Sequence, residues 1–333
     1  MTTQNTAKKP KIFIARAIFA DALPQLEESF EVTSNQSDEV LTPEELQKAL
    51  VGMDGALVSG GDRIDAKVLS AAKDLKIVAN IAVGYNNLDI PAMTAAGVMG
   101  TNTPDVLTDT TADFGFALMM AAARRVTESE HWLRAGKWEK WALFNNPLGV
   151  DIHHSTLGII GMGRIGQAIA KRGLGFGMKV IYCNRKRLPE ALEQECGATH
   201  VSKEELLKTA DHIILVLPYS AESHHTIGEK ELSLMKPTAT LTNIARGGIV
   251  NDLALAQALK AGKIFGAGLD VFEGEPKVIP ELLACSNVVL APHVGSSTEQ
   301  TRRAMMNLAI KNLRAGLAGQ RPPNLINTDL MQN

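Results

Sequence analysis

One stretch of the chain decides its fold: Thr156-Leu157-Gly158-Ile159-Ile160-Gly161-Met162-Gly163-Arg164-Ile165-Gly166. Its first half is a short apolar run typical of a buried strand, and an amphipathic helical pattern begins at Arg164. Of the three glycines between them, the first permits a tight turn, the second lets a pyrophosphate approach the backbone, and the third lets the helix pack on the strand. A chance match is the alternative, but the strand–turn–helix context favours a dinucleotide site. The expected cofactor contacts are Gly161, Gly163, Arg164, Ile165 and Gly166.

The same alternation of apolar runs and helical patterns continues on both sides of this stretch. Strands are expected at 11–15, 55–59, 76–82, 156–160, 179–183, 213–217, 239–244, 264–269 and 288–290. Between them, a helix opens at Thr42 with Pro43 and a capping-box Glu45, and long helices are expected over 105–126 and 299–317. Strands separated by helices predict an α/β fold with parallel sheets.

Composition limits the number of domains and the class of partner. A length of 333 residues favours two domains, and 45% apolar with 21% charged residues is ordinary for a globular protein. The net charge of -2 argues against a nucleic-acid or membrane-surface partner, and we expect neither a membrane helix nor a signal peptide. The isolated Cys183, Cys196 and Cys285 fit a reducing cytosol, hence a cytoplasmic location without disulfides or a zinc site.

The strand after the glycine stretch bears on the choice of cofactor. NAD-binding folds place an acidic residue near the end of this strand for the ribose hydroxyls. This chain has Asn184-Arg185-Lys186-Arg187 there, with no carboxylate to repel a 2′-phosphate and three cations to bind one. A solvated basic turn is the alternative. We predict NADP as cofactor, with NADPH preferred and NAD possible, and Asn184, Arg185 and Lys186 as contacts.

Three later segments each place a reactive side chain after a strand, where ligands collect in open α/β sheets. Arg246 precedes two glycines, Glu275 lies in a run with three carboxylates, and His293 follows the last strand. Together they suit reduction of a 2-oxo acid, with Arg246 binding the carboxylate and His293 donating the proton. Glu275 beside His293 would favour the imidazolium ion. Separately, each has a structural alternative: a helix-cap donor, a loop charge and a turn histidine.

At these residues the chain resembles the D-isomer-specific 2-hydroxyacid dehydrogenase family over nearly its full length. The stretches that carry the resemblance are Ala82–Asp89, Asn102–Thr108, Leu157–Gly166, Asn243–Gly248, Gly268–Pro276 and Pro292–Ser297. Within the family, 151–154 and the turn at 184–187 are most similar to glyoxylate/hydroxypyruvate reductases, including the 2-ketogluconate reductase type. We expect no C-terminal regulatory domain, in contrast to many phosphoglycerate dehydrogenases.

The resemblance implies two Rossmann- or flavodoxin-like domains with the active site in the cleft between them. Residues 1–104 plus 298–333 would form the substrate domain, and 105–297 the NADP-binding domain. The family implies Arg246 as the substrate-orienting residue, Glu275 as the residue that orients the histidine, and His293 as the acid/base. The substrate contacts expected are Ser59, Gly60, Val83 and Gly84, together with Arg246 and His293. Further cofactor contacts are expected at Thr110, Leu217, Pro218, Ile244, Ala245, Asp270 and Gly295.

The predicted function is NADPH-dependent reduction of glyoxylate and hydroxypyruvate, with 2-keto-D-gluconate as a further candidate, to D-2-hydroxy acids. One alternative in the same fold is an NAD-linked dehydrogenase of another D-2-hydroxy acid, phosphoglycerate, formate or phosphite. An alternative of another class is a non-catalytic, dinucleotide-sensing corepressor or binding protein.

Two other clusters bear on metals and oligomeric state. The pairs His153-His154 and His224-His225 look like metal ligands, but neighbours in an extended chain point opposite ways and no carboxylate completes a site, so no metal is predicted. All three tryptophans, Trp132, Trp138 and Trp141, lie between the 105–126 helix and the glycine stretch. We interpret this concentration as a homodimerisation arm, with Trp138 or Trp141 reaching a neighbouring site, against the alternative of local packing around a loop.

Overall fold

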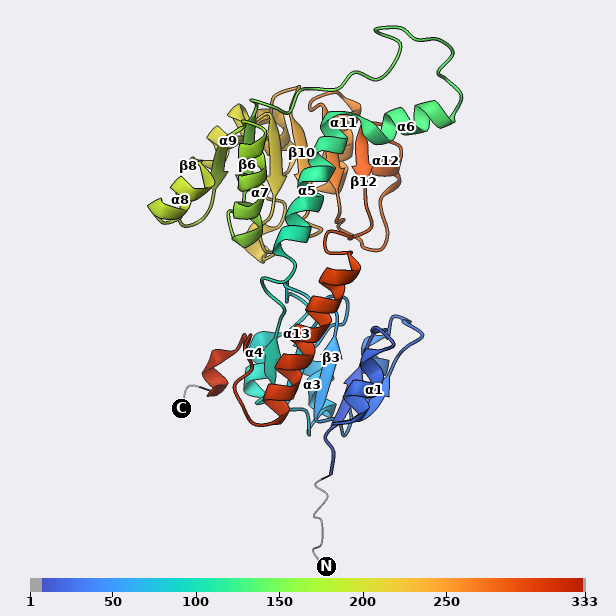
Figure 1. Ribbon diagram of the computed structural model, residues 1–333, viewed down its shortest axis with the longest axis vertical. Coiled ribbons are helices and arrows are strands. Elements are labelled where there is room, and N and C mark those ends of the chain that lie inside the picture. Colours follow the sequence, from blue (N-terminus) through green and yellow to red (C-terminus); the bar gives the residue numbers. More distant parts are fainter. Residues whose placement is uncertain (1–7, 332–333) are drawn as a thin grey trace, which may run out of the picture. The chain divides into compact units, whose positions relative to one another are not determined.

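The computed structural model describes residues 8–331, which divide into two compact units. Unit 1 comprises the chain up to Leu107 and again from Thr298, and unit 2 is the continuous segment Thr108–Ser297 (Figure 1). The chain therefore leaves the first unit once and returns to it.

Unit 1 is built on a five-stranded parallel sheet with the order β2-β1-β3-β4-β5. This is the order of flavodoxin-like folds. The strands are β1 Lys11–Ile14, β2 Glu31–Ser34, β3 Gly55–Val58, β4 Ile77–Asn80 and β5 Met99–Thr101. The helices are α1 Ala22–Glu27, α2 Pro43–Ala49, α3 Ala66–Ala71, α4 Ile90–Ala95 and α13 Glu299–Leu317, followed by a short 3-10 helix, η2 Thr328–Met331.

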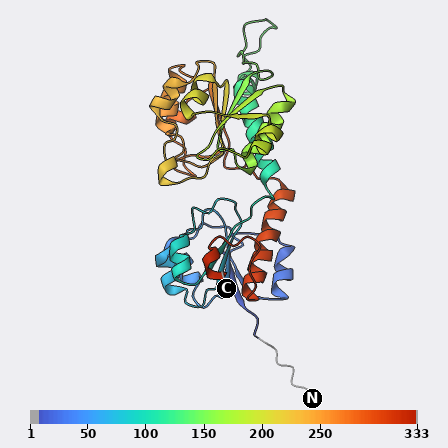
Figure 2. The same ribbon diagram turned by 90° about the vertical axis from the view of Figure 1, so that its left-hand side faces the viewer.

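Alternation along β1 shows how the sheet of unit 1 is covered on both faces. Ile12 and Ile14 pack with the α1 and α13 side chains Leu26 and Leu313, whereas Phe13 packs in a second core with residues of α2, α3 and α4. Because successive side chains of a strand point to opposite faces, one strand supplies both cores. Figure 2 shows the helices on the two faces of this sheet.

Unit 2 has a seven-stranded parallel sheet with the order β12-β11-β10-β9-β6-β7-β8. Starting from β6, this is the doubly wound Rossmann order with one strand added, so the predicted pair of Rossmann- and flavodoxin-like domains is confirmed. The strands are β6 Thr156–Ile160, β7 Lys179–Cys183, β8 Ala198–His200, β9 His212–Leu215, β10 Thr240–Asn243, β11 Gly266–Leu269 and β12 Val288–Leu290.

The helices of unit 2 form two layers around this sheet. One core contains side chains of α5 Thr108–Ala123, α7 Arg164–Gly175 and α8 Glu190–Cys196. The opposite core contains side chains of α9 Lys203–Thr209, α10 Glu229–Leu234, α11 Asp252–Lys260 and α12 Pro280–Leu283. The remaining elements are α6 Val126–Arg134 and the 3-10 helix η1 Ala221–Ser223. The strand ends of unit 2 that carry predicted site residues are the C-terminal ends of parallel strands, so they lie along the same side of this sheet.

The prediction of a single helix over 105–126 is wrong in its bounds. The chain forms α5 and then α6, separated at Arg125, whose φ of 51° lies in the left-handed region. A left-handed residue cannot continue a right-handed helix, so α6 begins afresh at Val126. The sequence, with Pro322-Pro323, also predicts an extended tail over 320–333, and this is wrong in part, because η2 forms at Thr328–Met331. Over 8–331, no helix combines the length and apolarity needed to cross a membrane.

Candidate active site

The glycine stretch forms the turn between β6 and α7. Gly161 has a φ of 103°, and a Cβ there would lie 2.7 Å from backbone atoms of Val216 and Leu217. A Cβ on Gly166 would collide with the carbonyl oxygen of Gly161, so the first turn of α7 can approach the loop only without a side chain. Gly163, the N-cap of α7, has nothing within 4 Å of its Cβ position. The backbone at Gly163 therefore faces open space at a helix N-terminus, a geometry that fits a pyrophosphate.

Asn184 and Arg185 follow β7 at the same edge of the sheet. The Oδ1 atom of Asn184 accepts a hydrogen bond from the backbone N–H of Met162 at 2.7 Å, which joins the turn after β7 to the glycine loop. Arg185 and Lys186 are exposed beside it. Two cations thus lie where the ribose end of a dinucleotide is expected.

The third cation of this turn has another partner. Arg187 donates from Nε and Nη2 to the carboxylate of Glu193, at 2.9 and 2.7 Å. Tyr182 also donates to Glu193, and the hydrogen bond from Arg187, followed by that from Tyr182, lowers the pKa of Glu193 to about 2. Arg187 therefore uses two of its donors to hold Glu193, whereas Arg185 and Lys186 are exposed beside Asn184.

His293 and Glu275 are brought together from different strand ends. The Nδ1 atom of His293 lies 2.8 Å from Oε2 of Glu275, and the backbone N–H of Phe272 donates to Oε1 at 3.0 Å. Burial alone would raise the pKa of Glu275, but the hydrogen bonds from His293 and Phe272 outweigh it and lower the pKa. An ionised carboxylate only accepts hydrogen bonds, so Nδ1 of His293 carries the proton and Nε2 is left for chemistry.

Arg246 follows β10, with its charge close enough to lower the pKa of Glu275 further. Its own pKa is lowered by burial and raised by Glu275, with burial the larger effect. Nη1 donates to the carbonyl oxygen of Ala245 at 2.7 Å, which fixes one side of the guanidinium. The structure thus groups Arg246, Glu275 and His293 at neighbouring strand ends of unit 2.

Asp270 is 2% exposed and holds the loop that carries His293. Its two carboxylate oxygens accept the backbone N–H groups of Val294 and Gly295 at 2.7 and 2.8 Å. Burial raises its pKa, and those two hydrogen bonds oppose the rise. The structure therefore shows Asp270 as the anchor of the turn at His293, whose φ is 54°.

The other predicted cofactor residues lie around the same edge. Leu217 and Pro218 follow β9, Ile244 and Ala245 follow β10, and Thr110 lies in the first turn of α5. The Oγ1 atom of Thr242, in β10, is buried and has no hydrogen-bond partner within residues 8–331.

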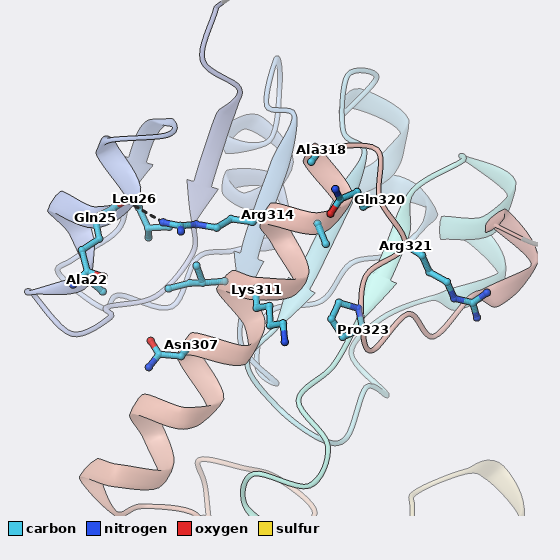
Figure 3. Close-up of a pocket in the computed structure, with 12 residues that line it drawn as sticks. Ala22, Gln25, Leu26, Asn307, Lys311, Arg314, Ala318, Gln320, Arg321 and Pro323 are labelled. Atoms are coloured by element: carbon cyan, nitrogen blue, oxygen red, sulfur yellow. Dashed lines mark hydrogen bonds between the residues drawn. The ribbon is translucent and has the colours of Figure 1, made fainter.

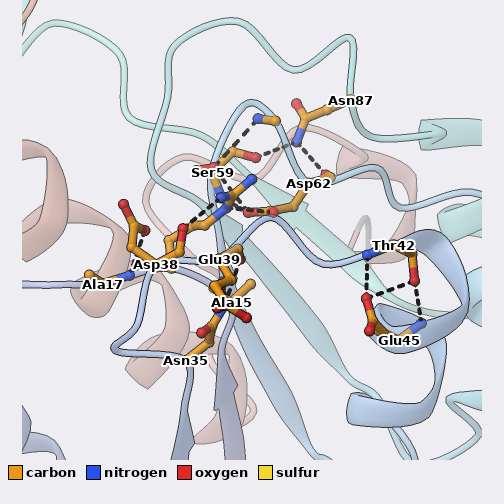
Figure 4. A network of polar contacts seen from close by, with 12 residues as sticks. Ala15, Ala17, Asn35, Asp38, Glu39, Thr42, Glu45, Ser59, Asp62 and Asn87 are labelled. Carbon is orange, nitrogen blue, oxygen red and sulfur yellow. Dashed lines mark hydrogen bonds and ion pairs between the residues drawn. The ribbon is translucent and has the colours of Figure 1, made fainter. Parts of the chain in front are cut away.

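The predicted substrate residues of unit 1 lie after its central strands, and Figure 4 shows Ser59 in a polar network with Asp62 and Asn87. Ser59, after β3, donates its hydroxyl to Asp62 at 3.0 Å, and Asn87 donates to the carbonyl oxygens of both residues. Gly60 is exposed at the tip of this loop. In the loop after β4, the carbonyl oxygen of Val83 accepts a hydrogen bond from Asn102 at 2.8 Å. The carbonyl oxygen of Gly84 accepts one from Asn80 at 3.0 Å. Hydrogen bonds hold both loops, and the sequence did not mark the residues that make them, Asp62, Asn80, Asn87 and Asn102.

A cavity of about 640 Å³ elsewhere in unit 1 contains none of these residues. It lies beside α1 and α13, with Lys311, Arg314 and Arg321 among its lining side chains (Figure 3). Arg314 donates to the carbonyl oxygen of Gln25 at 3.2 Å. The lining cations are exposed and the cavity is open, so it has no place in the site described above.

The two histidine pairs are not in extended chain. His154 and His225 have φ values of 57° and 50°, so each pair sits in a turn, and the rings of His224 and His225 stack at 3.8 Å. The geometric reason for expecting the rings to point apart is therefore wrong. His225 instead contacts Glu273, at 2.9 Å between Nε2 and Oε1.

Comparison with known proteins agrees with this geometry. A sequence profile for the NAD-binding domain of D-isomer-specific 2-hydroxyacid dehydrogenases matches residues 116–295. A glyoxylate reductase of Thermococcus onnurineus is 47% identical over 326 residues, 97% of each chain.

Solved structures of similar proteins cover almost the whole chain. A putative D-isomer-specific 2-hydroxyacid dehydrogenase of a Polaromonas species has a TM-score of 0.88 and 35% identity, covering 96% of this chain and 99% of that one. An NADPH-dependent glyoxylate/hydroxypyruvate reductase of Sinorhizobium meliloti, in complex with NADP and malonate, has a TM-score of 0.85 and 33% identity, covering 96% and 97%.

The profile match spans more than half of the chain and the curated relatives align over almost all of it. The structure of this chain agrees with that match: it has the glycine loop, the two sheet orders, and the group of Arg246, Glu275 and His293. The protein therefore belongs to the D-isomer-specific 2-hydroxyacid dehydrogenase family, oxidoreductases that act on CH–OH groups with a nicotinamide cofactor.

Proposed function

We propose that the protein is an NADPH-dependent reductase of small 2-oxo acids, with glyoxylate and hydroxypyruvate as substrates and 2-keto-D-gluconate as a further candidate. The observation that carries the proposal is the 2.8 Å contact between His293 and Glu275 beside Arg246. The names of the relatives, glyoxylate reductase and glyoxylate/hydroxypyruvate reductase, support this substrate class.

The chemistry assigned to the chain's own residues follows from their donors and acceptors. Arg246 presents forked N–H donors suited to a carboxylate and an adjacent ketone oxygen. His293, held through Nδ1 by Glu275, donates the proton from Nε2 to the oxygen on which negative charge develops. In the oxidative direction, neutral Nε2 accepts that proton. When bound, the nicotinamide supplies the hydride.

The remaining contacts belong to the same proposal. Residues Ser59, Gly60, Val83 and Gly84 bind substrate, and residues 105–297 bind the cofactor through the glycine loop and the strand ends described above. The cofactor contacts assigned outside that loop are Thr110, Asn184, Arg185, Lys186, Leu217, Pro218, Ile244, Ala245, Asp270 and Gly295. We further propose that the protein is a cytoplasmic homodimer.

The preference for NADPH rests on the turn after β7. Arg185 and Lys186 are exposed there, and Asn184 occupies the position at which NAD-binding folds have an acidic residue. The double variant Asn184→Asp, Arg185→Ala should shift kcat/KM toward NADH, because it adds a charge that repels a 2′-phosphate and removes one that binds it. Arg187→Ala is the matched control, since Glu193 already binds that guanidinium. An unchanged cofactor ratio in the double variant contradicts the preference.

Turnover with a panel of 2-oxo acids tests the function as a whole. Loss of NADPH absorbance should be fast with glyoxylate or hydroxypyruvate and should be followed with NADH in parallel. Turnover only of another acid with NADH would favour the NAD-linked alternative, such as a phosphoglycerate, formate or phosphite dehydrogenase. Tight NADPH binding without turnover of any 2-oxo acid would instead support a dinucleotide-sensing binding protein.

A further inference from the structure

Three loops of unit 2 meet beside the proposed catalytic group. The first follows η1 and carries His225, the second follows β10 and carries Arg246, and the third follows β11 and carries Glu275. They are packed too closely for a side chain at Gly247, whose Cβ would collide with the carbonyl oxygen of Phe272. Arg246 and Glu275 are therefore mounted on two loops in direct contact.

His225 bonds to both of those loops. Its backbone N–H donates to the carbonyl oxygen of Gly248 at 2.7 Å, within the loop of Arg246. Its ring Nε2 lies 2.9 Å from Oε1 of Glu273, within the loop of Glu275. His225 makes both contacts with a left-handed φ of 50°.

Asn251 decides which ring nitrogen of His225 carries the proton. Its Oδ1 caps α11 by accepting the N–H of Ala254 at 2.8 Å, so its amide nitrogen faces the ring and lies 3.4 Å from Nδ1 of His225. An amide nitrogen only donates, so Nδ1 of the neutral ring must accept. The proton then sits on Nε2 and is donated to Glu273.

The backbone of Glu273 is held from the same side by α11. The N–H of Glu273 donates to Oδ2 of Asp252 at 3.0 Å, and the N–H of Asp252 donates to Oε1 of Glu273 at 3.1 Å. Asp252 is 4% exposed, so its side of this reciprocal pair is buried, whereas the Glu273 side chain is partly exposed. With His225, this pair fixes Glu273 through three hydrogen bonds on a loop that also carries Glu275.

We propose that His225 is a positioning residue that, through Glu273, sets the loop of Glu275 against the loop of Arg246. Glu275 accepts the N–H of Phe272, the residue immediately before Glu273, so a displacement of Glu273 moves the carboxylate that orients His293. His225 touches none of the reacting groups, and its role rests on the proposed function of Arg246, Glu275 and His293.

The test compares His225→Leu, which removes both ring nitrogens, with His225→Gln, whose amide can still donate to Glu273. With glyoxylate and NADPH as the probes, His225→Leu should lower kcat by roughly tenfold to a hundredfold, the order expected for a small misplacement of catalytic groups. It should also raise KM, because Arg246 is displaced with its loop. His225→Gln should restore much of both values, and His224→Leu, which alters the stacked neighbour without touching Glu273, should stay at the parent values.

A second readout does not depend on turnover. The ¹⁵N shifts of the His293 ring, assigned by comparison with His293→Ala, should report the Nδ1–H tautomer in the parent and a gain of the Nε2–H tautomer in His225→Leu. If no 2-oxo acid is reduced, the proposed function fails, and this tautomer comparison alone decides the positioning role. The proposal is overturned if folded His225→Leu has the kcat and KM of the parent or an unchanged His293 tautomer. A lower melting temperature without a change in kcat also overturns it.

Discussion

At the scale of single residues, unit 2 contains two histidine–carboxylate pairs whose carboxylates lie on the same loop, after β11. His293 with Glu275 is the pair to which we assign proton transfer, and His225 with Glu273 is the pair to which we assign positioning. Both contacts are 3 Å or shorter, yet their surroundings differ, because only the first has Arg246 near its carboxylate. Distance alone therefore does not distinguish a catalytic pair from a supporting one.

Removing the acid/base group tests the first pair. His293→Ala should lower kcat by roughly 10²–10⁴-fold, the usual contribution of general acid–base catalysis, with a smaller effect on cofactor binding. Steady-state kinetics with glyoxylate and NADPH measures the change, and Arg246→Ala is the companion that should raise KM as well as lower kcat. Near-normal turnover by His293→Ala would remove it from the proposed mechanism.

Asp252 predicts a pH dependence of stability. Burial, with the charge of Glu273 adding to it, raises its pKa to about 6, well above the value in an unfolded chain. The folded state therefore holds the proton more tightly, so this group's stabilisation is complete below about pH 4 and is lost as the pH rises through 6. A shift of this size corresponds to about 3 kcal/mol.

The variant Asp252→Asn should remove that dependence, because its amide oxygen can still accept the N–H of Glu273 without titrating. Urea unfolding of both proteins between pH 4 and 7 measures it, with Asp113→Asn as an exposed control. Parallel curves for parent and Asp252→Asn would show that Asp252 does not titrate in this range.

At the scale of helices and strands, elements with strong local signals were predictable. Thr42 caps α2, its hydroxyl accepting the N–H of Glu45 at 3.2 Å while the Glu45 carboxylate accepts the N–H of Thr42 (Figure 4). The bounds of β6, β7 and α13 match those expected, since a capping box or an apolar run is a property of neighbouring residues.

The strands that the sequence did not predict lack such local signals. Strand β2 reads Glu-Val-Thr-Ser and is largely exposed at the edge of its sheet, so no apolar run marks it. β5 and β8 are three residues long and also lie at edges. Such strands form because a neighbouring strand offers unpaired backbone groups, which the local sequence does not reveal.

The junction of β6 and α7 can be tested with a matched pair of glycines. Gly166→Ala should destabilise the protein by about 1–3 kcal/mol, since its Cβ would collide with the carbonyl oxygen of Gly161. Gly175→Ala in the same helix has nothing within 4 Å of its Cβ and should be neutral or stabilising by up to about 1 kcal/mol. Chemical denaturation measures both, and equal effects would contradict the close approach seen at Gly166.

At the scale of the whole molecule, unit 2 exposes an apolar segment after α6. Trp141 is 78% and Phe144 82% exposed, with Trp138 and Leu143 also more than half exposed. Large apolar side chains gathered on one segment are typical of an interface, which supports the proposed homodimerisation arm over local packing.

Sedimentation tests the arm directly. The parent should sediment as a dimer at micromolar concentration, and the double variant Trp141→Asp, Phe144→Asp should sediment as a monomer, because two charges cannot be buried unpaired in an interface. Val51→Asp is the control, an exposed apolar residue of unit 1. A monomeric parent refutes the arm, and loss of activity in the monomer would indicate that a tryptophan reaches a neighbouring site.

By itself, the sequence determined the dinucleotide loop, the parallel α/β architecture and the identity of Arg246, Glu275 and His293 as candidates, because these depend on local patterns and on the edge at which parallel strands end. Only the tertiary structure decided which side chains meet. Arg187 donates to Glu193, and His225 meets Glu273, 48 positions along the chain. A hydrogen bond between residues so far apart in the sequence depends on how the loops pack against one another. That packing follows from the two cores on the faces of the sheet in unit 2.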